Sequence, residues 1–342
     1  MEDKRKYWDP EKETMPLDKL QELQGKRLQV LATLAYEKTS LYRRKFDEAG
    51  IQPSDIKTVE DIRNLPLTDD VEDIRNRPLS DRLTILPREI ERFNSTSGTT
   101  TGMPEPIPFN KKDTDTLIDA EAQGRWTVGV RPNDTAQILT NYDISEMGYD
   151  RLGATFLLLS AGRFMLDKQI MINKTAGVTV LEHFPSQLKR FASQAQELGI
   201  NVNDLPLRMI IGVGEPLSNS EKIELEELFG APVMTMWHMM ESGPIAAECG
   251  ARKGLHIFSH RSILEVVDPE TGELLPDGEE GELIVTPLLY ETMPLIRYRT
   301  GDVARILPYE PCSCGRTLPR MSLIRGRVSQ ITDRKGKKKG RL

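Results

Sequence analysis

A loop at residues 94–104, with the sequence NSTSGTTTGMP, carries hydroxyl side chains around two glycines. It directly follows a strand-like segment at residues 90–93. Glycines let backbone N–H groups turn inward without a side-chain clash, and Ser and Thr hydroxyls add donors that match phosphate oxygens. A flexible polar linker has the same composition, so the loop by itself favours neither interpretation. The candidate phosphate-binding residues are Ser95, Ser97, Gly98, Thr99, Thr100, Thr101 and Gly102.

Three later segments could complete a nucleotide site. The sequence GVGEP at residues 212–216 follows a buried strand, and its glycines let a flat ring approach the backbone, although a plain strand-to-helix turn fits equally well. Residues 237–243 (WHMMESG) close the next strand, and Glu241 could hold the magnesium of a triphosphate or cap a solvent-facing helix. Residues 298–302 (YRTGD) end a strand in Asp302, whose two oxygens could accept both ribose hydroxyls or form a simple turn.

The chain has three cysteines, and all three can be assigned to one metal site. Cys312 and Cys314 are separated by one residue, while Cys249 and His256 lie on the two sides of a short loop that contains glycine. Three Cys and one His match the closed tetrahedral ligand set of a structural zinc site. Unpaired, inert thiols are the alternative, and the close spacing of Cys312 and Cys314 favours zinc.

The composition is that of a large folded protein without a nucleic-acid surface. A chain of 342 residues is long enough for about two domains, or for one large α/β unit with an appended layer. Acidic and basic residues are interspersed along the chain and give a net charge of −6. Only the tail at residues 334–341 is a basic run. No apolar run approaches the roughly 18 residues that span a bilayer, and the N-terminus lacks the apolar segment of a secretory signal. With an odd number of cysteines, we expect a cytoplasmic protein without disulfides or membrane partners.

Strand-like and helical patterns alternate through residues 91–245, which predicts crossover units around a largely parallel sheet. Ligands bind beyond the carboxyl ends of such strands, so the loops after residues 93, 211 and 236 are expected to converge. Helices are also expected between residues 17 and 49, and strands at 263–267, 282–286 and 295–298 predict an antiparallel β subdomain. The expected parallel strands are at residues 136–140, 154–159, 177–181, 207–211 and 232–236, and the helices between them are at 113–129, 167–175, 187–198 and 218–229.

The ordered series of motifs resembles the adenylate-forming enzymes, and within them the phenylacetate–CoA ligase family. The resemblance covers about residues 20–327 and implies an α/β fold, the N-terminal core of that superfamily. It also implies that ATP activates a carboxylic acid, such as phenylacetate or another aryl acid, to an acyl-adenylate whose acyl group is then transferred to CoA. The motifs are the loop at 94–104, GEP at 214–216, ESGP at 241–244, GLHI at 254–257, DPETGE at 268–273 and RYRTGD at 297–302.

The resemblance further implies roles for single residues. Glu241 is expected to bind Mg²⁺, and Asp302 to hold the ribose, with Arg327 also at the nucleotide. Gly214 and Glu215, followed by Pro216, are expected to border the adenine. Attack of a carboxylate on the α-phosphate joins two anions, so catalysis must come mainly from positioning and from neutralised charge. The β- and γ-phosphates are assigned to Ser97, Gly98, Thr99, Thr100 and Gly102, and the expected catalytic residues are Thr99, Thr100 and Glu241.

The acid pocket is expected to be built at the same edge of the sheet. His238 stands where relatives usually have glycine, and a role in the pocket wall is favoured over proton transfer, because an already ionised acid needs no general base. Trp237 and Met239 flank it. The other pocket candidates are Gly212 and two residues in a loop after another strand, Tyr142 and Met147.

The sequence departs from the family pattern in two places. The phosphate loop has one more threonine than usual and Met103 where a lysine is expected. Phosphate binding is therefore expected either to be weaker or to use other basic groups such as Arg299. The family continues past residue 327 with a smaller C-terminal domain that closes over the site and helps to deliver CoA. We expect that domain to be absent here, with residues 328–342 as a basic tail, which leaves the CoA step open.

We divide the chain into a helical segment at residues 1–90, an α/β part that binds nucleotide and acid at 91–245, and a β-rich part with the zinc site at 246–327. Two other functions stay open at this point. One is an adenylyltransferase of the type that adenylates a deazaflavin cofactor, and the other is a nucleotide-binding protein with weakened catalysis. The resemblance also implies a homodimer.

Overall fold

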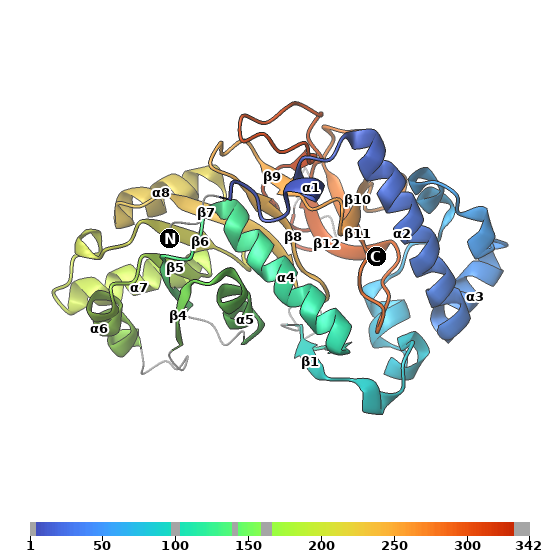
Figure 1. Cartoon of the computed structure of the whole chain (residues 1–342), viewed down its shortest axis with the longest axis horizontal. Coiled ribbons are helices and arrows are strands. Elements are labelled where there is room, and N and C mark those ends of the chain that lie inside the picture. Colours follow the sequence, from blue (N-terminus) through green and yellow to red (C-terminus); the bar gives the residue numbers. More distant parts are fainter. Residues whose placement is uncertain (1–4, 97–102, 139–142, 159–165, 332–342) are drawn as a thin grey trace.

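A computed structural model describes residues 5–96, 103–138, 143–158 and 166–331 (Figure 1). Two β-sheets dominate the described chain. The larger sheet has eight strands in the order β13-β9-β8-β7-β6-β5-β3-β4. Its strands are β3 (Thr135–Ile138), β4 (Thr155–Leu158), β5 (Val180–His183), β6 (Met209–Gly212), β7 (Val233–Met239), β8 (Gly243–Glu248), β9 (Leu255–Ile257) and β13 (Arg320–Met321).

The larger sheet is mixed. Strands β3 to β7 are parallel to one another, as the sequence predicts. Strands β8, β9 and β13 then extend the sheet in antiparallel pairing. The α/β fold class is therefore confirmed. Strand β8 runs across residue 245, where the sequence suggested the boundary between two parts of the chain.

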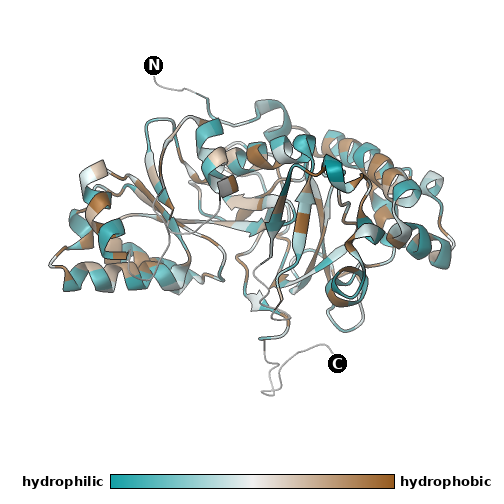
Figure 2. Cartoon of the chain, turned by 90° about the horizontal axis from the view of Figure 1, so that it is seen from below, coloured by the Kyte–Doolittle hydropathy of each residue, from teal (hydrophilic) through white to brown (hydrophobic). Residues whose placement is uncertain are grey.

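Helices cover both faces of the larger sheet, because successive residues of its buried strands point to opposite sides. Met209 and Ile211 pack in one cluster with Trp126 of α4, whereas Ile210 packs in another with Phe191 of α7. The helices carry hydrophilic and hydrophobic residues side by side, as expected when one side of each is buried (Figure 2). These helices are α4 (Lys111–Val128) and α5 (Asp143–Leu152) on one face, and α6 (Leu166–Ala176), α7 (Pro185–Glu197) and α8 (Asn219–Phe229) on the other.

The smaller sheet is antiparallel, with the strand order β10-β11-β12-β14, which confirms the predicted antiparallel β subdomain. Tyr42 and Phe46 of the N-terminal helices pack against Val266 and Val285 of this sheet in one buried cluster. In Figure 1 these helices lie along the outer side of the smaller sheet. The elements are α2 (Leu17–Lys38), α3 (Ser40–Ala49), β10 (Ser262–Val267), β11 (Gly281–Pro287), β12 (Tyr298–Ala304) and β14 (Gly326–Arg327).

Strand β12 begins where the sequence expected the third antiparallel strand to end, so the prediction of a strand at residues 295–298 is wrong. Ile284 pairs with Arg299 and Glu282 pairs with Val303, which leaves extra residues on β12 between these pairs. Gly301 lies in this bulge with φ of +74°, a conformation that side chains disfavour. The irregular stretch therefore contains Asp302.

Short elements complete the described chain. A two-stranded hairpin of β1 (Arg92–Ser95) and β2 (Pro106–Phe109) flanks the predicted phosphate loop. Within the described ranges, no helix combines the length and the apolar character needed to cross a membrane. The short helices are α1 (Pro10–Glu13), η1 (Pro53–Asp55), η2 (Val59–Asn64), η3 (Asp70–Arg75), η4 (Leu79–Arg82), η5 (Pro87–Glu89) and η6 (Val202–Asp204).

Helix α5 replaces the loop that was expected around Met147. It packs closely on α4, because Gly148 has no side chain to separate the two helices. A Cβ atom at Gly148 would lie 2.5 Å from the Cβ of Glu121. A glycine in the middle of a short helix lowers helix propensity, which explains why the local sequence favours a loop.

We predict that Gly148→Ala destabilises the protein by about 1–3 kcal/mol, because the added methyl group overlaps α4. The measurement is urea unfolding of the purified chain. In a helix, alanine is normally more stable than glycine by about 1 kcal/mol. A loss of stability in Gly148→Ala would therefore come from the steric overlap with α4. Gly250→Ala is the control, since a Cβ atom at Gly250 would meet nothing within 4 Å. Unchanged or increased stability of Gly148→Ala would contradict close packing of α4 on α5.

Candidate active site

A cavity of about 410 Å³ lies at the carboxyl ends of β6 and β7, against β12 of the smaller sheet. The segments that follow β5, β6 and β7 line it, and Thr96 reaches it from the end of β1. The expected convergence of the loops after residues 93, 211 and 236 is therefore seen in the described part of the chain. Ligands of α/β proteins bind at this edge of the sheet, which makes the cavity the candidate active site.

The cavity brings together nine residues that the sequence singled out. They come from the loop after β6, from β7 and the turn after it, and from β12 and β14. Their convergence is evidence for one site, because these segments are far apart in the chain. The nine residues are Gly214, Glu215, Pro216, Trp237, His238, Met239, Glu241, Asp302 and Arg327.

Other predicted residues lie elsewhere. Ser95 is exposed at the end of β1, and Met147 is 38% exposed on α5, where Ser145 lines the cavity instead. Gly212 packs against Leu217, which would lie 2.7 Å from a Cβ atom at that position. Met147 and Gly212 are thus not cavity-wall residues in this structure. Seven further candidates lie outside the described residues: Ser97, Gly98, Thr99, Thr100, Thr101, Gly102 and Tyr142.

An aromatic ring that was not expected from the sequence lies against Gly214. A Cβ atom at Gly214 would be 2.3 Å from Cε1 of Phe184, and the φ of Gly214 is +75°. Both the close approach and the backbone angle require glycine here. Phe184 directly follows β5 at the same edge of the sheet. Its place directly after a buried strand is the signal in the sequence that could have indicated a role at the site. Phe184 packs on one side of the Gly214 turn.

The carboxylate of Glu215 holds the β6–α8 loop to the start of α7. It accepts hydrogen bonds from the backbone N–H and the hydroxyl of Ser186, at 3.0 and 2.8 Å. A negative charge near a helix N-terminus is stabilised by the orphan N–H groups and the helix dipole. Glu215 therefore fixes the position of the Gly214 turn.

Asp302 joins the two sheets at the cavity. Its Oδ2 accepts a hydrogen bond from Trp237 Nε1 at 3.0 Å, and its Oδ1 pairs with Arg327 at 3.0 Å. Burial raises the pKa of Asp302, and the charge of Arg327 acts in the opposite direction. Each carboxylate oxygen has a second lone pair, so Asp302 can still accept hydrogen bonds from two ribose hydroxyls.

Glu241 and Asp70 place two carboxylates in the same cavity. Burial raises the pKa of Glu241, and the negative charge of Asp70 raises it further, while His238 and Arg327 lower it. Asp70 itself accepts hydrogen bonds from Tyr298 at 2.9 Å and Arg75 at 2.8 Å. Two carboxylates whose charges repel suit a divalent cation such as Mg²⁺. Asp70 comes from an N-terminal segment with no sequence signal for this role.

Arg75 supplies a basic group beside the predicted phosphate loop. Its guanidinium donates to the carbonyl oxygen of Met103 at 2.7 Å, and it lines the cavity. Arg299, which the sequence suggested for this purpose, is instead bound to Glu282 and to the carbonyl oxygen of Pro269. Arg299 does not line the cavity, whereas Arg75 does, although Arg75 is also paired with Asp70. Arg75 is the described arginine that lies at the end of the loop.

A buried ionic network holds His238 in the wall of the cavity. Its Nε2 lies 2.6 Å from the carboxylate of Glu121. Glu121 also pairs with Arg125, whose guanidinium donates to Glu182 at 2.7 and 3.1 Å. Tyr149 donates its hydroxyl to Glu182 at 2.7 Å. Glu121 and Arg125 have the i, i+4 spacing of an exposed helix pair, so no local pattern indicates that they are buried.

Metal ligation is the second feature that the sequence predicted. The ligand atoms of Cys249, His256, Cys312 and Cys314 all lie within 4.8 Å of one another. The sulfurs of Cys249 and Cys312 are 3.7 Å apart, close to the ~3.8 Å expected for two thiolates that share a tetrahedral zinc ion. His256 Nδ1 lies 3.1 Å from the carbonyl oxygen of Leu318, which leaves Nε2, 3.3 Å from Cys314, free to face a metal.

The comparisons with known proteins agree with this geometry. The model of the AMP-binding enzyme family matches residues 94–287. Phenylacetate-coenzyme A ligase of Thermus thermophilus is 33% identical over 334 residues, which are 95% of this chain and 74% of the relative. The chain belongs to the AMP-binding enzyme family, and within it to the branch of the phenylacetate–CoA ligases.

Solved structures give the same assignment. A crystal structure of 2-hydroxyisobutyryl-CoA ligase in the postadenylation state, with an acyl-AMP, has a TM-score of 0.89 and 28% identity, covering 97% of this chain and 73% of that one. An open conformation of this ligase, in complex with the acyl-AMP and CoA, has a TM-score of 0.88 and 27% identity and covers 97% and 80%. The cavity thus lies in a fold that holds acyl-adenylates in a similar protein.

The buried network predicts a pH-dependent contribution to stability. Burial alone would raise the pKa of Glu121, but the positive charges of His238 and Arg125 outweigh it and lower the pKa to about 2. A folded-state pKa below the ordinary value of 4.5 stabilises the protein above about pH 4.5, and this contribution is lost as the pH falls towards 2. We predict that Glu121→Gln destabilises the protein by about 3 kcal/mol near neutral pH, and by less at each step below pH 4.5.

Denaturant unfolding across this pH range measures the difference between the two proteins. Glu224→Gln is the control, because Glu224 is exposed and its ion pair is with the exposed Lys189. A difference between wild type and Glu121→Gln that does not change with pH would show that Glu121 is not ionised in the folded protein.

Proposed function

We propose that this chain activates a carboxylic acid with ATP. An oxygen of the acid attacks the α-phosphorus, the bond to the bridging oxygen of the β-phosphate breaks, and pyrophosphate leaves with the electron pair. The observation that carries the proposal is the convergence of Gly214, Glu241 and Asp302 from three separate segments on one cavity. The product is an acyl-adenylate, the class of molecule that the similar 2-hydroxyisobutyryl-CoA ligase structure contains.

The described residues would act mainly on position and charge, because the reaction brings two anions together. Asp302 would accept hydrogen bonds from the ribose, and the Gly214 turn would border the adenine beside Phe184. Glu241, with Asp70 nearby, fits the oxygen donors of a Mg²⁺ ion, which would supply positive charge at the phosphates. We assign the remaining phosphate contacts to Thr99 and Thr100 and the other residues of the loop.

We propose an aryl acid such as phenylacetate as the substrate. Phenylacetate is the acid in the name of the Thermus thermophilus relative. Met236 and Met239 would contact an apolar ring, while His238 and Ser145 offer polar contacts on the same cavity. In this arrangement His238 is a wall residue held by Glu121, and the reaction needs no proton from it.

The acyl group would then pass to CoA. The thiolate of CoA attacks the carbonyl carbon of the acyl-adenylate, a thioester forms, and AMP leaves with the electron pair of the broken bond. The names of the relatives support this step, since they are coenzyme A ligases. An adenylyltransferase of the deazaflavin type would release an AMP-bearing product without CoA, and a nucleotide-binding protein would bind ATP without turnover. The homodimer and the cytoplasmic location stay predictions.

We predict ATP–pyrophosphate exchange that depends on an aryl acid and Mg²⁺. Asp302→Asn should lower kcat/KM for ATP by about 10- to 100-fold, mostly through KM, because one charged acceptor for the ribose is lost. Asp277→Asn, an exposed aspartate of the same sheet region, is the matched control and should behave as wild type. Absence of exchange with a broad panel of acids, in a folded sample with Mg²⁺, would refute acid activation. Release of a thioester when CoA is added separates the ligase from the two alternatives.

We also propose that the cysteine cluster holds a structural zinc ion. The support is the four-ligand geometry and the orientation of His256 by Leu318.

We predict about one zinc ion per purified chain by elemental analysis. Cys312→Ser should remove most of it and lower the melting temperature by several degrees, because the cluster connects segments that are distant in the chain. Ser313→Ala changes the exposed residue between two ligands and should leave zinc content and melting temperature unaltered. Metal-free wild-type protein with an unchanged melting temperature after chelation would exclude a structural role for zinc.

A further inference from the structure

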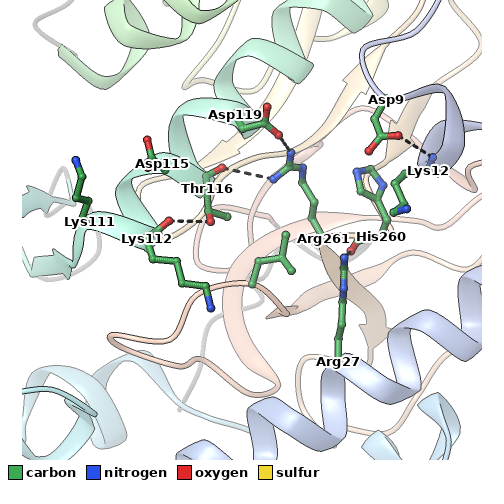
Figure 3. Close-up of a pocket in the computed structure, with 11 residues that line it drawn as sticks. Asp9, Lys12, Arg27, Lys111, Lys112, Asp115, Thr116, Asp119, His260 and Arg261 are labelled. Carbon is green, nitrogen blue, oxygen red and sulfur yellow. Dashed lines mark hydrogen bonds and ion pairs between the residues drawn. The ribbon is translucent and has the colours of Figure 1, made fainter.

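A second cavity, of about 670 Å³, lies between the N-terminal helices and the start of α4 (Figure 3). Among the described residues it shares no wall with the candidate active site. It is a groove that is widely open to solvent. Eleven residues line it: Asp9, Lys12, Arg27, Lys111, Lys112, Asp115, Thr116, Asp119, His260, Arg261 and Leu289.

Positive charge dominates this cavity. Five of its lining residues are Lys or Arg and three are Asp. The carboxylates already have partners. Asp9 accepts a hydrogen bond from the backbone of α1, Asp115 pairs with Arg151 outside the cavity, and Asp119 pairs with Arg261 and accepts from Trp8. The same holds for four of the cations, which pair with carboxylates inside or outside the cavity: Lys12 with Glu11, Lys111 with Glu91, Lys112 with Glu291 and Arg261 with Asp119.

Arg27 is the cation with the fewest partners. It is half-buried, and its guanidinium donates to the carbonyl oxygen of His260, but it forms no ion pair with a carboxylate of the described chain. Burial lowers the pKa of Arg27, and the nearby positive charge of Arg261 lowers it further, while the negative charge of Asp9 acts in the opposite direction. An anion between Arg27 and Arg261 would remove this repulsion.

His260 provides an independent sign of a missing ligand. It is only 4% exposed, and its Nδ1 has no hydrogen-bond partner in the described chain, although buried polar atoms usually have one. Its other nitrogen, Nε2, donates to Gln123 Oε1 at 3.2 Å, so Nδ1 of the neutral ring is an acceptor. In Figure 3 the His260 ring lies beside Asp9 and Lys12 on the wall of the cavity. Burial, Arg261, Arg27 and Lys12 all lower the pKa of His260, so the positive potential reaches its ring.

We propose that this second cavity binds the phosphate group of a small molecule, with Arg27, Arg261 and Lys12 as charged donors, while His260 Nδ1 accepts a hydrogen bond from a P–OH or another hydroxyl of the ligand. A phosphate carries up to two negative charges and several acceptor oxygens, which match two guanidinium groups and an ammonium. The cavity is larger than one phosphate needs, so the free anion and a phosphorylated organic molecule are the two possible sources. The proposal does not depend on the acid-activating reaction.

The four histidines of the chain allow a direct test. His260 reports on the second cavity, His238 on the candidate active site and His256 on the cysteine cluster. The full chain is labelled with ¹³C-histidine, saturated with AMP to fill the nucleotide site, and titrated with inorganic phosphate or with ribose 5-phosphate. His260→Gln assigns the His260 ring signal.

We expect phosphate to shift the His260 signal in a saturable manner while the other three signals stay in place. Tighter binding of ribose 5-phosphate would identify the organic phosphate as the source, and equal or tighter binding of inorganic phosphate would identify the free anion. Arg27→Gln should weaken the binding at least tenfold, because a charge-assisted hydrogen bond is lost. Lys26→Gln, which removes an exposed charge from the same helix, is the control.

The proposal fails if neither compound moves the His260 signal, if only His238 responds, or if Arg27→Gln and Lys26→Gln bind alike. Should Arg27→Gln not fold, Lys12→Gln takes its place, because the ion pair of the Lys12 ammonium is with the exposed Glu11. Lys12→Gln should then weaken phosphate binding severalfold while the signals of His183, His238 and His256 keep their positions. Unaltered binding by Lys12→Gln would also refute the site.

Discussion

The buried guanidinium of Arg125 is the interaction on which the acid end of the active site depends. A charge in the protein interior is costly unless it is paired and hydrogen-bonded. Arg125 is 1% exposed and lies between two carboxylates, Glu121 on its own helix and Glu182 at the end of β5. The ring of Tyr149 lies 4.6 Å from the guanidinium carbon. These contacts fix α4, α5 and β5 relative to one another, and Glu121 then fixes His238 on β7.

The nucleotide end has a different physical basis, because it is assembled from both sheets. Trp237 belongs to the larger sheet and Asp302 to the smaller one, and the hydrogen bond between them crosses the junction. Tyr298, Thr300 and Asp302 of β12 line the cavity, which is the alternation of one face of a strand. The irregular pairing around Gly301 includes Asp302 and adds two residues to β12 relative to β11, so this face is kept on both sides of it.

The sequence was sufficient for the parallel strands and for the residues that follow them, because buried strands and glycine turns leave local patterns. Gly214 and Glu241 follow parallel strands and line the cavity, as does Asp302 on the antiparallel strand β12. Asp70 and Arg75 could not be found from the sequence, since they reach the cavity from a distant segment through tertiary packing alone. Helix α5 was also missed, because its central glycine is favourable only against α4. Arg299 was given the wrong role for the same reason: its partner Glu282 lies on the neighbouring strand.

The C-terminal part of the described chain is attached to the body at three successive points. Cys312 and Cys314 lie in the cysteine cluster, β13 pairs with β9, and β14 pairs with β12, with Arg327 opposite Asp302. The segment between the cysteine cluster and Arg327 is therefore short and is held at both of its ends. The range of positions that the Arg327 guanidinium can take then depends partly on how firmly the cysteine cluster holds Cys312 and Cys314. A looser cluster would spread the orientations of Arg327 over Asp302 without breaking any contact within the cavity itself.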